Sequence, residues 1–242
     1  MLSLKQSLSL SSCKGLGGEF EPTDINSLQL WYKNLLGMEN VAGDTDADDF
    51  VTGDLIKWQS QVGSNLLYND QNWNRPLWGE TKMAININGN RFYELDTNLT
   101  ISGDFTMCFS IRFENTPATD GILGSGNTNL FEAEDNNTFA FRAGGTSEIS
   151  ITHASKTLSP YVWYTIILTR ESGTVSVYVD GGSITNTLWG TGTDSDTLTV
   201  ETIGSWNGDN HNLDGFIRDI SYFNEAITSS ERSNMIAYIN NY

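Results

Sequence analysis

The chain has 242 residues, of which 38% are hydrophobic, enough for one large domain or two small ones. It carries 30 acidic and 13 basic residues, and the formal net charge of -17 argues against nucleic acid and anionic membrane surfaces as partners. Its two cysteines, expected to be free thiols, are too few for a disulfide scaffold, and no window approaches about eighteen consecutive apolar residues, which argues against a membrane-spanning segment.

The first 18 residues have a pattern of their own. Leucines alternate with polar residues, and a glycine-rich stretch follows at residues 15–18. The alternating leucines are Leu2, Leu4, Leu8 and Leu10. This pattern is typical of a strand, which needs a sheet to join, and it lacks the continuous apolar run of a secretory signal. We therefore expect residues 1–18 to be a docking arm on a glycine hinge and residues 19–242 to form one domain.

An acidic stretch follows between residues 39 and 54. Its closest carboxylates are Asp44, Asp46, Asp48 and Asp49. Calcium favours several carboxylate oxygens on a flexible loop, but Asp49 and Leu55 stand where an EF-hand loop needs glycine and glutamate. The stretch is therefore either a solvated acidic loop or a calcium site, and calcium is the one cofactor that the sequence raises.

Two loops rich in tryptophan and asparagine are candidate sites for a glycan or a protein partner. A sugar stacks its C–H face on an aromatic ring, and its hydroxyl groups bond to amide and carboxylate side chains. The candidates are Trp73 and Asn74 in one loop, and Trp206, Asn207, Asp209 and Asn210 in the other. The alternative is that these tryptophans fill the ends of the fold.

From residue 84 onward the pattern is that of antiparallel strands. Residues 84–87 and 91–93 flank Asn88-Gly89-Asn90, a favoured tight-turn sequence, so we expect a hairpin there. Residues 104–113 place Phe105, Met107, Phe109, Ile111 and Phe113 on one face of a strand. Residues 164–170 and 174–180 predict a second hairpin, joined through Glu171-Ser172-Gly173.

Four further strands are expected, at residues 138–142, 148–152, 197–203 and 216–223. The last is apolar on both faces, which predicts a central strand that is covered on both sides. One face carries Phe216, Ile220 and Tyr222, and the other carries Ile217 and Phe223. Many short strands without helical crossovers favour two antiparallel sheets packed face to face.

The end of the chain predicts one helix. Thr228 and Glu231 have the spacing of a capping box, and Met235, Ile236 and Ile239 form an apolar stripe behind them. We expect this helix to pack on the sandwich.

Three stretches resemble laminin G-like domains. "WYTIILTRESGTVSVYVDG" (163–181) resembles their strand–turn–strand signature, and "GDFTMCFSIRF" (103–113) resembles the strand before it. "LDGFIRDISYFNEAITSSE" (213–231) resembles their closing strand and the start of the final helix. The resemblance covers about residues 82–240 and is to the concanavalin A-like lectin and glucanase superfamily. It implies an all-β jelly-roll sandwich of two antiparallel sheets with one short C-terminal helix.

Upstream, "EFEPTDINSLQLWYKN" (19–34), "GDLIKWQSQVGSN" (53–65) and "NWNRPLW" (72–78) resemble a variant common in bacteriophage virion proteins. This resemblance implies a structural component of a virion, such as a head decoration, fibre or baseplate protein. Its partners would be other virion proteins bound through the arm, in a homo-oligomer or multi-copy assembly. A host surface glycan would be a further partner.

Catalytic patterns are incomplete. Glucanases of this superfamily carry Glu-x-Asp-x-(x)-Glu on one strand, which places the nucleophile and the acid/base on one face. Glu94-Leu95-Asp96 lacks the third carboxylate, since Asn98 and Leu99 stand at its two allowed positions, and the run 132–135 is followed by asparagines. No Gly-x-Ser-x-Gly elbow accompanies the two histidines. We therefore predict a protein that is not an enzyme; the alternatives are a free secreted or surface carbohydrate-binding module and, third, a divergent glycoside hydrolase.

Overall fold

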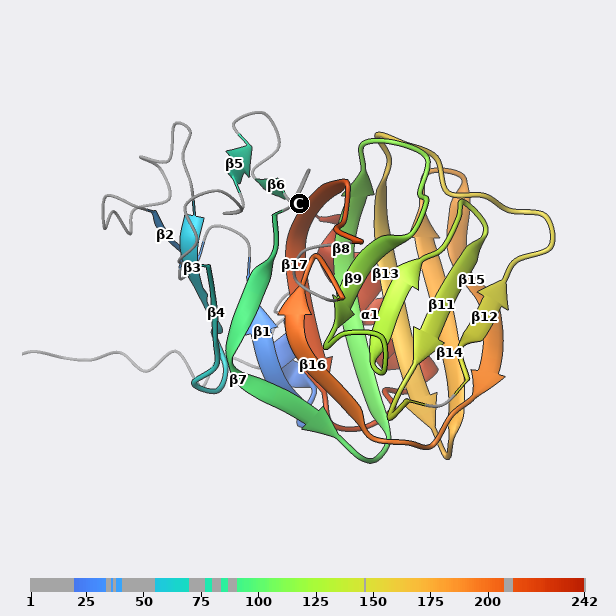
Figure 1. The fold of residues 1–242 in the computed structure, drawn as a ribbon, viewed down its shortest axis with the longest axis horizontal. Helices are drawn as coiled ribbons and strands as arrows, with labels where there is room; N and C mark the ends of the chain where they lie inside the picture. Colours follow the sequence, from blue (N-terminus) through green and yellow to red (C-terminus); the bar gives the residue numbers. More distant parts are fainter. Residues whose placement is uncertain are drawn as a thin grey trace, which may run out of the picture.

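The computed structural model describes residues 20–33, 36, 38–40, 55–69, 77–79, 84–86, 91–145, 147–206 and 211–241. Within these ranges the chain forms two antiparallel sheets, packed face to face, and one α-helix (Figure 1). The predicted all-β sandwich is confirmed. The predicted arm, residues 1–18, lies outside the described residues, so the division of the chain at residue 18 stays a prediction.

In the described part of the chain, eight strands form the first sheet, here called sheet A. Its strand order is β15-β14-β13-β8-β17-β6-β5, and β1 also pairs with β17. The strands are β15 (Ile184–Thr193), β14 (Thr174–Gly181), β13 (Trp163–Glu171), β8 (Phe105–Phe113), β17 (Gly215–Phe223), β6 (Ala84–Asn86), β5 (Leu77–Gly79) and β1 (Leu28–Tyr32). The short 3-10 helix η1 (Pro22–Asp24) precedes β1.

Nine strands of the described residues form the second sheet, sheet B, in the order β12-β11-β10-β9-β16-β7-β4-β3-β2. They are β12 (Ile149–Thr152), β11 (Thr138–Arg142), β10 (Leu130–Ala133), β9 (Asp120–Gly124), β16 (Leu198–Ile203), β7 (Tyr93–Ile101), β4 (Leu66–Tyr68), β3 (Leu55–Gln59) and β2 (Met38–Asn40). The strands predicted near residues 138, 148 and 197 are therefore confirmed.

The hairpin predicted between residues 84 and 93 is wrong. β6 pairs with β17 and β5 in sheet A, whereas β7 pairs with β16 and β4 in sheet B. The chain therefore passes from one sheet to the other where we expected a tight turn. An Asn-Gly pair permits the turn conformation, but the apolar faces of the two strands decide which neighbours they pair with.

The core lies between the sheets and follows the predicted period of two. Along β8, the five predicted side chains from Phe105 to Phe113 face the inter-sheet core, and Cys108, a free cysteine, points to the opposite face. β13 and β14 form the predicted hairpin, with Ile166 opposite Val179 and Leu168 opposite Val177. Strand alternation alone therefore places these residues correctly.

β17 is central and buried along its whole length, as predicted. Its two faces differ from the prediction, because the register with β8 shifts between Ile217 and Asp219. A β-bulge of this kind moves the following residues by one position. As a result Ile217 shares the inter-sheet core with Ile220 and Tyr222, whereas Phe223 packs in the apolar cluster of the helix.

Helix α1 (Ser229–Asn240) covers the outer face of sheet A and lies behind the strands in Figure 1. Thr228 is its N-cap: the Thr228 hydroxyl accepts from the N–H of Glu231, and the Glu231 carboxylate accepts from the N–H of Thr228. Met235, Ile236 and Ile239 pack in the cluster that also holds Cys108 and Ile167 of sheet A. The predicted helix, its cap and its apolar stripe are confirmed. No helix in the described residues is long and apolar enough to cross a membrane.

Candidate functional site

With α1 on the outer face of sheet A, the outer face of sheet B carries a groove of about 600 Å³. The groove runs over β4, β7 and β16 and reaches the turn after β9. On β7, Tyr93 and Leu95 point into the core, so the alternation of the strand puts Glu94 and Asp96 on the groove side. The side chains that matter most for its chemistry are Tyr68, Glu94, Asp96, Asn98, Glu201 and Trp206.

Neighbouring strands hold these polar groups in fixed positions. Glu94 lies directly opposite Tyr68 of β4 on one side and Thr202 of β16 on the other. The Asn98 side-chain amide donates to Glu201 Oε1 over 2.8 Å, and the backbone N–H of Leu66 donates to Asp96 Oδ1 over 2.8 Å. The groove therefore presents oxygen acceptors on a rigid sheet rather than on loops.

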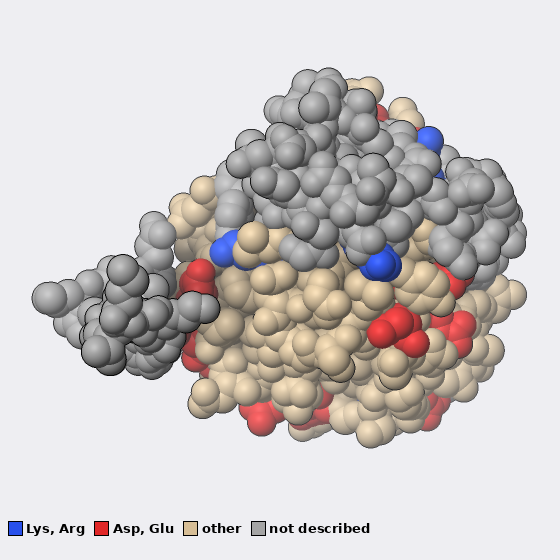
Figure 2. Space-filling view, turned by 90° about the vertical axis from the view of Figure 1, so that its left-hand side faces the viewer, with Lys and Arg blue, Asp and Glu red and all other residues tan. Residues whose placement is uncertain are grey.

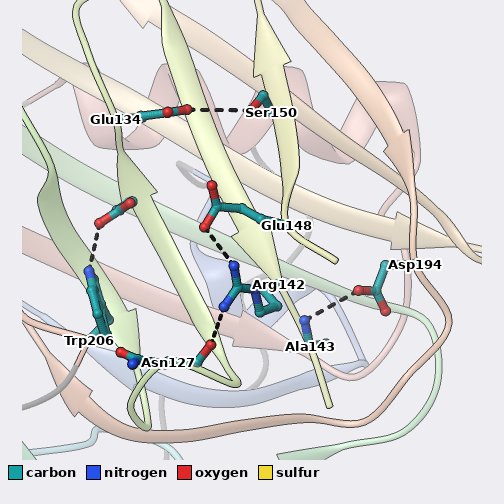
Figure 3. Close-up of polar contacts among 9 residues, drawn as sticks. Asn127, Glu134, Arg142, Ala143, Glu148, Ser150, Asp194 and Trp206 are labelled. Carbon is teal, nitrogen blue, oxygen red and sulfur yellow. Dashed lines mark hydrogen bonds and ion pairs between the residues drawn. The ribbon is translucent and has the colours of Figure 1, made fainter. Parts of the chain in front are cut away.

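Trp206 closes one side of the groove, but it is not an exposed platform as we expected. Its side chain is only 8% exposed, because the ring packs against Leu130 and Ala140 on the outer face of sheet B. The His211 ring stacks on the indole, with the ring centroids 4.4 Å apart. The indole Nε1 of Trp206 donates to Glu132 Oε2 over 2.6 Å (Figure 3). A buried indole N–H needs such a partner.

Two glycines of β9 allow Trp206 to lie this close to the sheet. A Cβ atom at Gly124 would lie 2.6 Å from the Cβ of Trp206, and one at Gly121 would lie 2.9 Å from its backbone nitrogen. Both separations are below any real contact between such atoms. A Cβ atom would lie even closer to backbone oxygens, 2.1 Å from that of His211 at Gly121 and 2.4 Å from that of Asn129 at Gly124, so a larger residue would displace the backbone as well as Trp206.

Glu132 of β10 is the unusual carboxyl group beside the groove. It is 5% exposed, and burial raises the pKa of Glu132 from 4.5 to about 7. The hydrogen bond from Trp206 lowers this pKa, whereas the nearby negative charges of Glu148, Glu134 and Asp120 raise it. Arg142 is paired with Glu148 over 3.1 Å and also donates to the Asn127 carbonyl (Figure 3). Ionisation of Glu132 therefore changes near neutral pH.

Most other predicted site residues lie outside the described residues. These are Asn207, Asp209 and Asn210 beside Trp206, the Trp73 and Asn74 loop, the acidic Asp44, Asp46, Asp48 and Asp49, and the four leucines of the arm. Of the predicted glycan-site residues, the structure therefore locates Trp206 alone. In the described ranges, no three His, Cys, Asp or Glu side chains are grouped to hold a metal ion.

Sequence reasoning missed the polar residues of the groove. Glu94 and Asp96 were considered only as an incomplete catalytic motif, and Tyr68, Asn98 and Glu201 were not considered as site residues. A signal was present, because residues 94, 96 and 98 are polar at alternate positions of one strand. What no pattern revealed is that Glu201, about a hundred residues later, lies beside them.

The comparisons with known proteins agree with this fold. The family described as the concanavalin A-like lectin/glucanases superfamily matches residues 85–231, and no curated protein matches the chain. Domain 4 of AbnA, an extracellular arabinanase from Geobacillus stearothermophilus solved with arabinotriose, is 14% identical with a TM-score of 0.56, covering 85% of this chain and 97% of that chain. Trypanosoma rangeli sialidase is 13% identical with a TM-score of 0.51, covering 86% of this chain and 32% of the sialidase.

The matched region contains the strands, the hairpin and the first residues of the helix from which we inferred the family. That inference is confirmed at the level of the superfamily, while the bacteriophage variant stays a prediction. The chain belongs to the concanavalin A-like lectin/glucanase superfamily.

Proposed function

We propose that the chain is a non-enzymatic carbohydrate-binding module that holds an oligosaccharide in the groove of sheet B. The observation that carries this proposal is the groove itself, in which an aromatic ring at Tyr68 lies opposite the carboxylate of Glu94, with further oxygen acceptors on the adjoining strands. Sugar hydroxyl groups donate to such acceptors, and the C–H face of a sugar packs on an aromatic ring.

The polar groups suit hydroxyl recognition along several sugar units. The Asn98 amide and the Glu201 carboxylate already form one hydrogen-bonded pair across two strands. Asp96 is held by the backbone of β4. Because these groups are fixed before a sugar binds, little conformational entropy is lost on binding.

The same groove is poorly arranged for hydrolysis. A general acid needs a raised pKa and must reach the glycosidic oxygen. Glu132 has the raised pKa, but it is buried and bonded to Trp206 beside the groove. Asp96 and Glu201, which do line the groove, are exposed and hold structural hydrogen bonds. These contacts favour binding without bond cleavage.

A carbohydrate ligand is also in keeping with the arabinanase domain that shares this fold, which was solved with arabinotriose. At 14% identity the likeness supports the fold, so the argument for a sugar rests on the groove of this chain.

The proposal can be tested by calorimetry with arabinotriose and by an array of neutral oligosaccharides. Tyr68→Ala should weaken binding at least tenfold, because it removes the aromatic face of the groove. The matched control is Tyr161→Asn, since Tyr161 is 67% exposed outside the groove, and its positive φ of 62° is tolerated by asparagine. Absence of binding to every sugar, or equal losses in both variants, would contradict the proposal; release of reducing ends would contradict its non-enzymatic part.

The segments upstream of residue 85 lead to a second candidate, a module carried on a bacteriophage particle through residues 1–18. It is supported by the resemblance of residues 19–34, 53–65 and 72–78 to virion proteins. The protein should then co-purify with particles, and deletion of residues 1–18 should abolish attachment while leaving sugar binding unchanged. A truncated protein that still decorates particles fully would show that the arm is not the anchor.

A further inference from the structure

We propose that Glu132 is the positioning residue that holds Trp206 at the side of the groove, and that its ionisation makes carbohydrate binding dependent on pH. The pH dependence of carbohydrate binding rests on the proposed function. The positioning of Trp206 by Glu132 does not, because it concerns the protein without any ligand.

The geometry makes Glu132 the anchor of the Trp206 ring. Strand β9 lies between β10, which carries Glu132, and β16, which leads to Trp206. The indole therefore reaches across β9 to make its 2.6 Å bond, over the space left by Gly121 and Gly124. On the groove side, the backbone carbonyl of Trp206 accepts from the N–H of Gly126, which lines the groove. A change in the ionisation of Glu132 therefore alters how firmly the Trp206 side chain is held, and Trp206 is bonded to Gly126 in the groove wall.

The charged groups around Glu132 place its ionisation in the neutral range. Asp120 of β9, Glu134 after β10 and Glu148 before β12 act on it with negative charge, and Arg142 of β11 is engaged by Glu148. With burial, they raise the pKa of Glu132 to about 7. The other titratable side chain in contact with Trp206 is His211, whose ring stacks on the indole.

The direction of the effect follows from the hydrogen bond. An ionised carboxylate accepts a charge-assisted bond from the indole N–H, which is stronger than the bond to a neutral acid. Protonation also gives Glu132 an O–H group that needs an acceptor beside the apolar Leu130 and Ala140. Trp206 is therefore held more firmly above pH 7 than below it, and groove affinity should be about fivefold higher on the alkaline side.

The first test needs no sugar. The indole N–H resonance of Trp206, assigned by its loss in Trp206→Phe, should shift with an apparent pKa of about 7. Glu132→Gln keeps an oxygen acceptor and removes the charge, so this shift should disappear while the resonance stays hydrogen-bonded. Glu134→Gln, two residues along the chain, removes a neighbouring charge and should keep the shift. A Trp206 resonance that does not titrate, or that titrates equally in Glu132→Gln, overturns the proposal.

The contribution of His211 is separated by His211→Asn. Asparagine tolerates the positive φ of 52° at this position, so the backbone is not strained. The pH-dependent shift of the Trp206 resonance should persist in His211→Asn and disappear in Glu132→Gln. A shift that disappears in His211→Asn and persists in Glu132→Gln would overturn the assignment to Glu132.

The second test is calorimetry with arabinotriose at about pH 5 and about pH 9. Wild type should bind about fivefold more tightly at the higher pH, and Glu132→Gln should bind with equal affinity at both. If the indole titrates as expected but arabinotriose and the array sugars do not bind at either pH, the proposed function fails and the positioning role of Glu132 stands. If a sugar binds with no dependence on pH in either protein, the coupling proposed here is wrong and the proposed function stands.

Discussion

Glu132 is a buried carboxyl group whose ionisation bears on stability and, under the proposed function, on sugar binding. In water a glutamate ionises near pH 4.5, but on the outer face of sheet B the side chain is 5% exposed and shares its surroundings with other carboxylates. The Trp206 N–H offsets part of the unfavourable free energy of ionisation. Ionisation of Glu132 is still less favourable in the folded protein than in water, because its pKa stays at about 7.

This cost predicts a component of stability that depends on pH. Between pH 4.5 and about 7 the unfolded chain ionises at Glu132 while the folded chain keeps the proton, so stability falls as pH rises through this window. Glu132→Gln removes this effect of pH. The difference in free energy of unfolding, Glu132→Gln minus wild type, should therefore rise by on the order of 3 kcal/mol from about pH 4 to about pH 8. Urea unfolding of both proteins at each pH measures this difference. A constant difference across the window would show that the folded protein does not retain the proton.

Trp206 also marks a limit of residue-level prediction. The sequence shows a tryptophan among asparagines, which favours an exposed sugar platform. The folded chain instead turns the ring onto Leu130, Ala140 and the carboxylate of Glu132. Those partners come from two strands about seventy residues earlier, so no local pattern contains them.

Among the elements, α1 is the one whose sequence signals are most complete. Its cap and its apolar stripe are local patterns, and both lie where they were predicted. β17 shows the opposite case: its alternation was clear, but a bulge that depends on pairing with β8 changed which residues share a face. Local sequence patterns predict the position of a helix or strand in the chain, whereas the register of a strand depends on the strands that pair with it.

Removal of the helix cap should weaken the packing of α1. Thr228→Ala should lower the free energy of unfolding by about 1 kcal/mol, because the first-turn N–H of Glu231 loses its acceptor. Ser230→Ala is the matched control, since Ser230 is exposed in the same turn and is not the cap. Equal effects of the two substitutions in chemical denaturation would mean that the capping box contributes nothing to stability.

β9 should be intolerant of side chains at its glycines. Gly124→Ala places a Cβ atom 2.4 Å from the Asn129 carbonyl oxygen and 2.6 Å from the Cβ of Trp206, so β9 must shift, or both Asn129 and Trp206 must. We expect a loss of about 2 kcal/mol in stability, together with a changed Trp206 indole resonance. Gly103→Ala is the control, because nothing lies within 4 Å of the added atom. A Gly124→Ala protein with unchanged stability and indole resonance would refute the close approach.

For the whole molecule, the negative charge bears on which sugars the proposed site would accept. The net charge is -17, and acidic side chains are scattered over the side seen in Figure 2, where basic ones show in only a few places. Glu94, Asp96 and Glu201 line the groove, and among the described residues no lysine or arginine does. Carboxylates gathered in one groove repel an anionic sugar before it makes any contact.

The groove should therefore discriminate between sugars by charge. We expect neutral arabinotriose to bind and oligogalacturonate, which carries carboxylates, to bind at least tenfold more weakly, a gap that narrows at high salt. Glu94→Gln should reduce the discrimination, whereas Glu225→Gln, an exposed change after β17, should not. Calorimetry with both sugars at two salt concentrations measures this. Equal affinities in wild type would mean that the groove carboxylates play no part in selection.

The sequence by itself determined the fold class, the family, most of the strands, the inward face of β8 and the capped helix. Each of these depends on residues close together in the chain, through a period of two, a turn sequence or a capping box. Only the tertiary structure decided the sheet to which β6 and β7 belong, the bulge in β17 and the site. Glu201 reaches Asn98, and Trp206 reaches Glu132, only because β16 enters sheet B between β7 and β9. Strand order depends on pairing between segments that are far apart in the sequence, and the alternation of residues along one strand does not specify its partner.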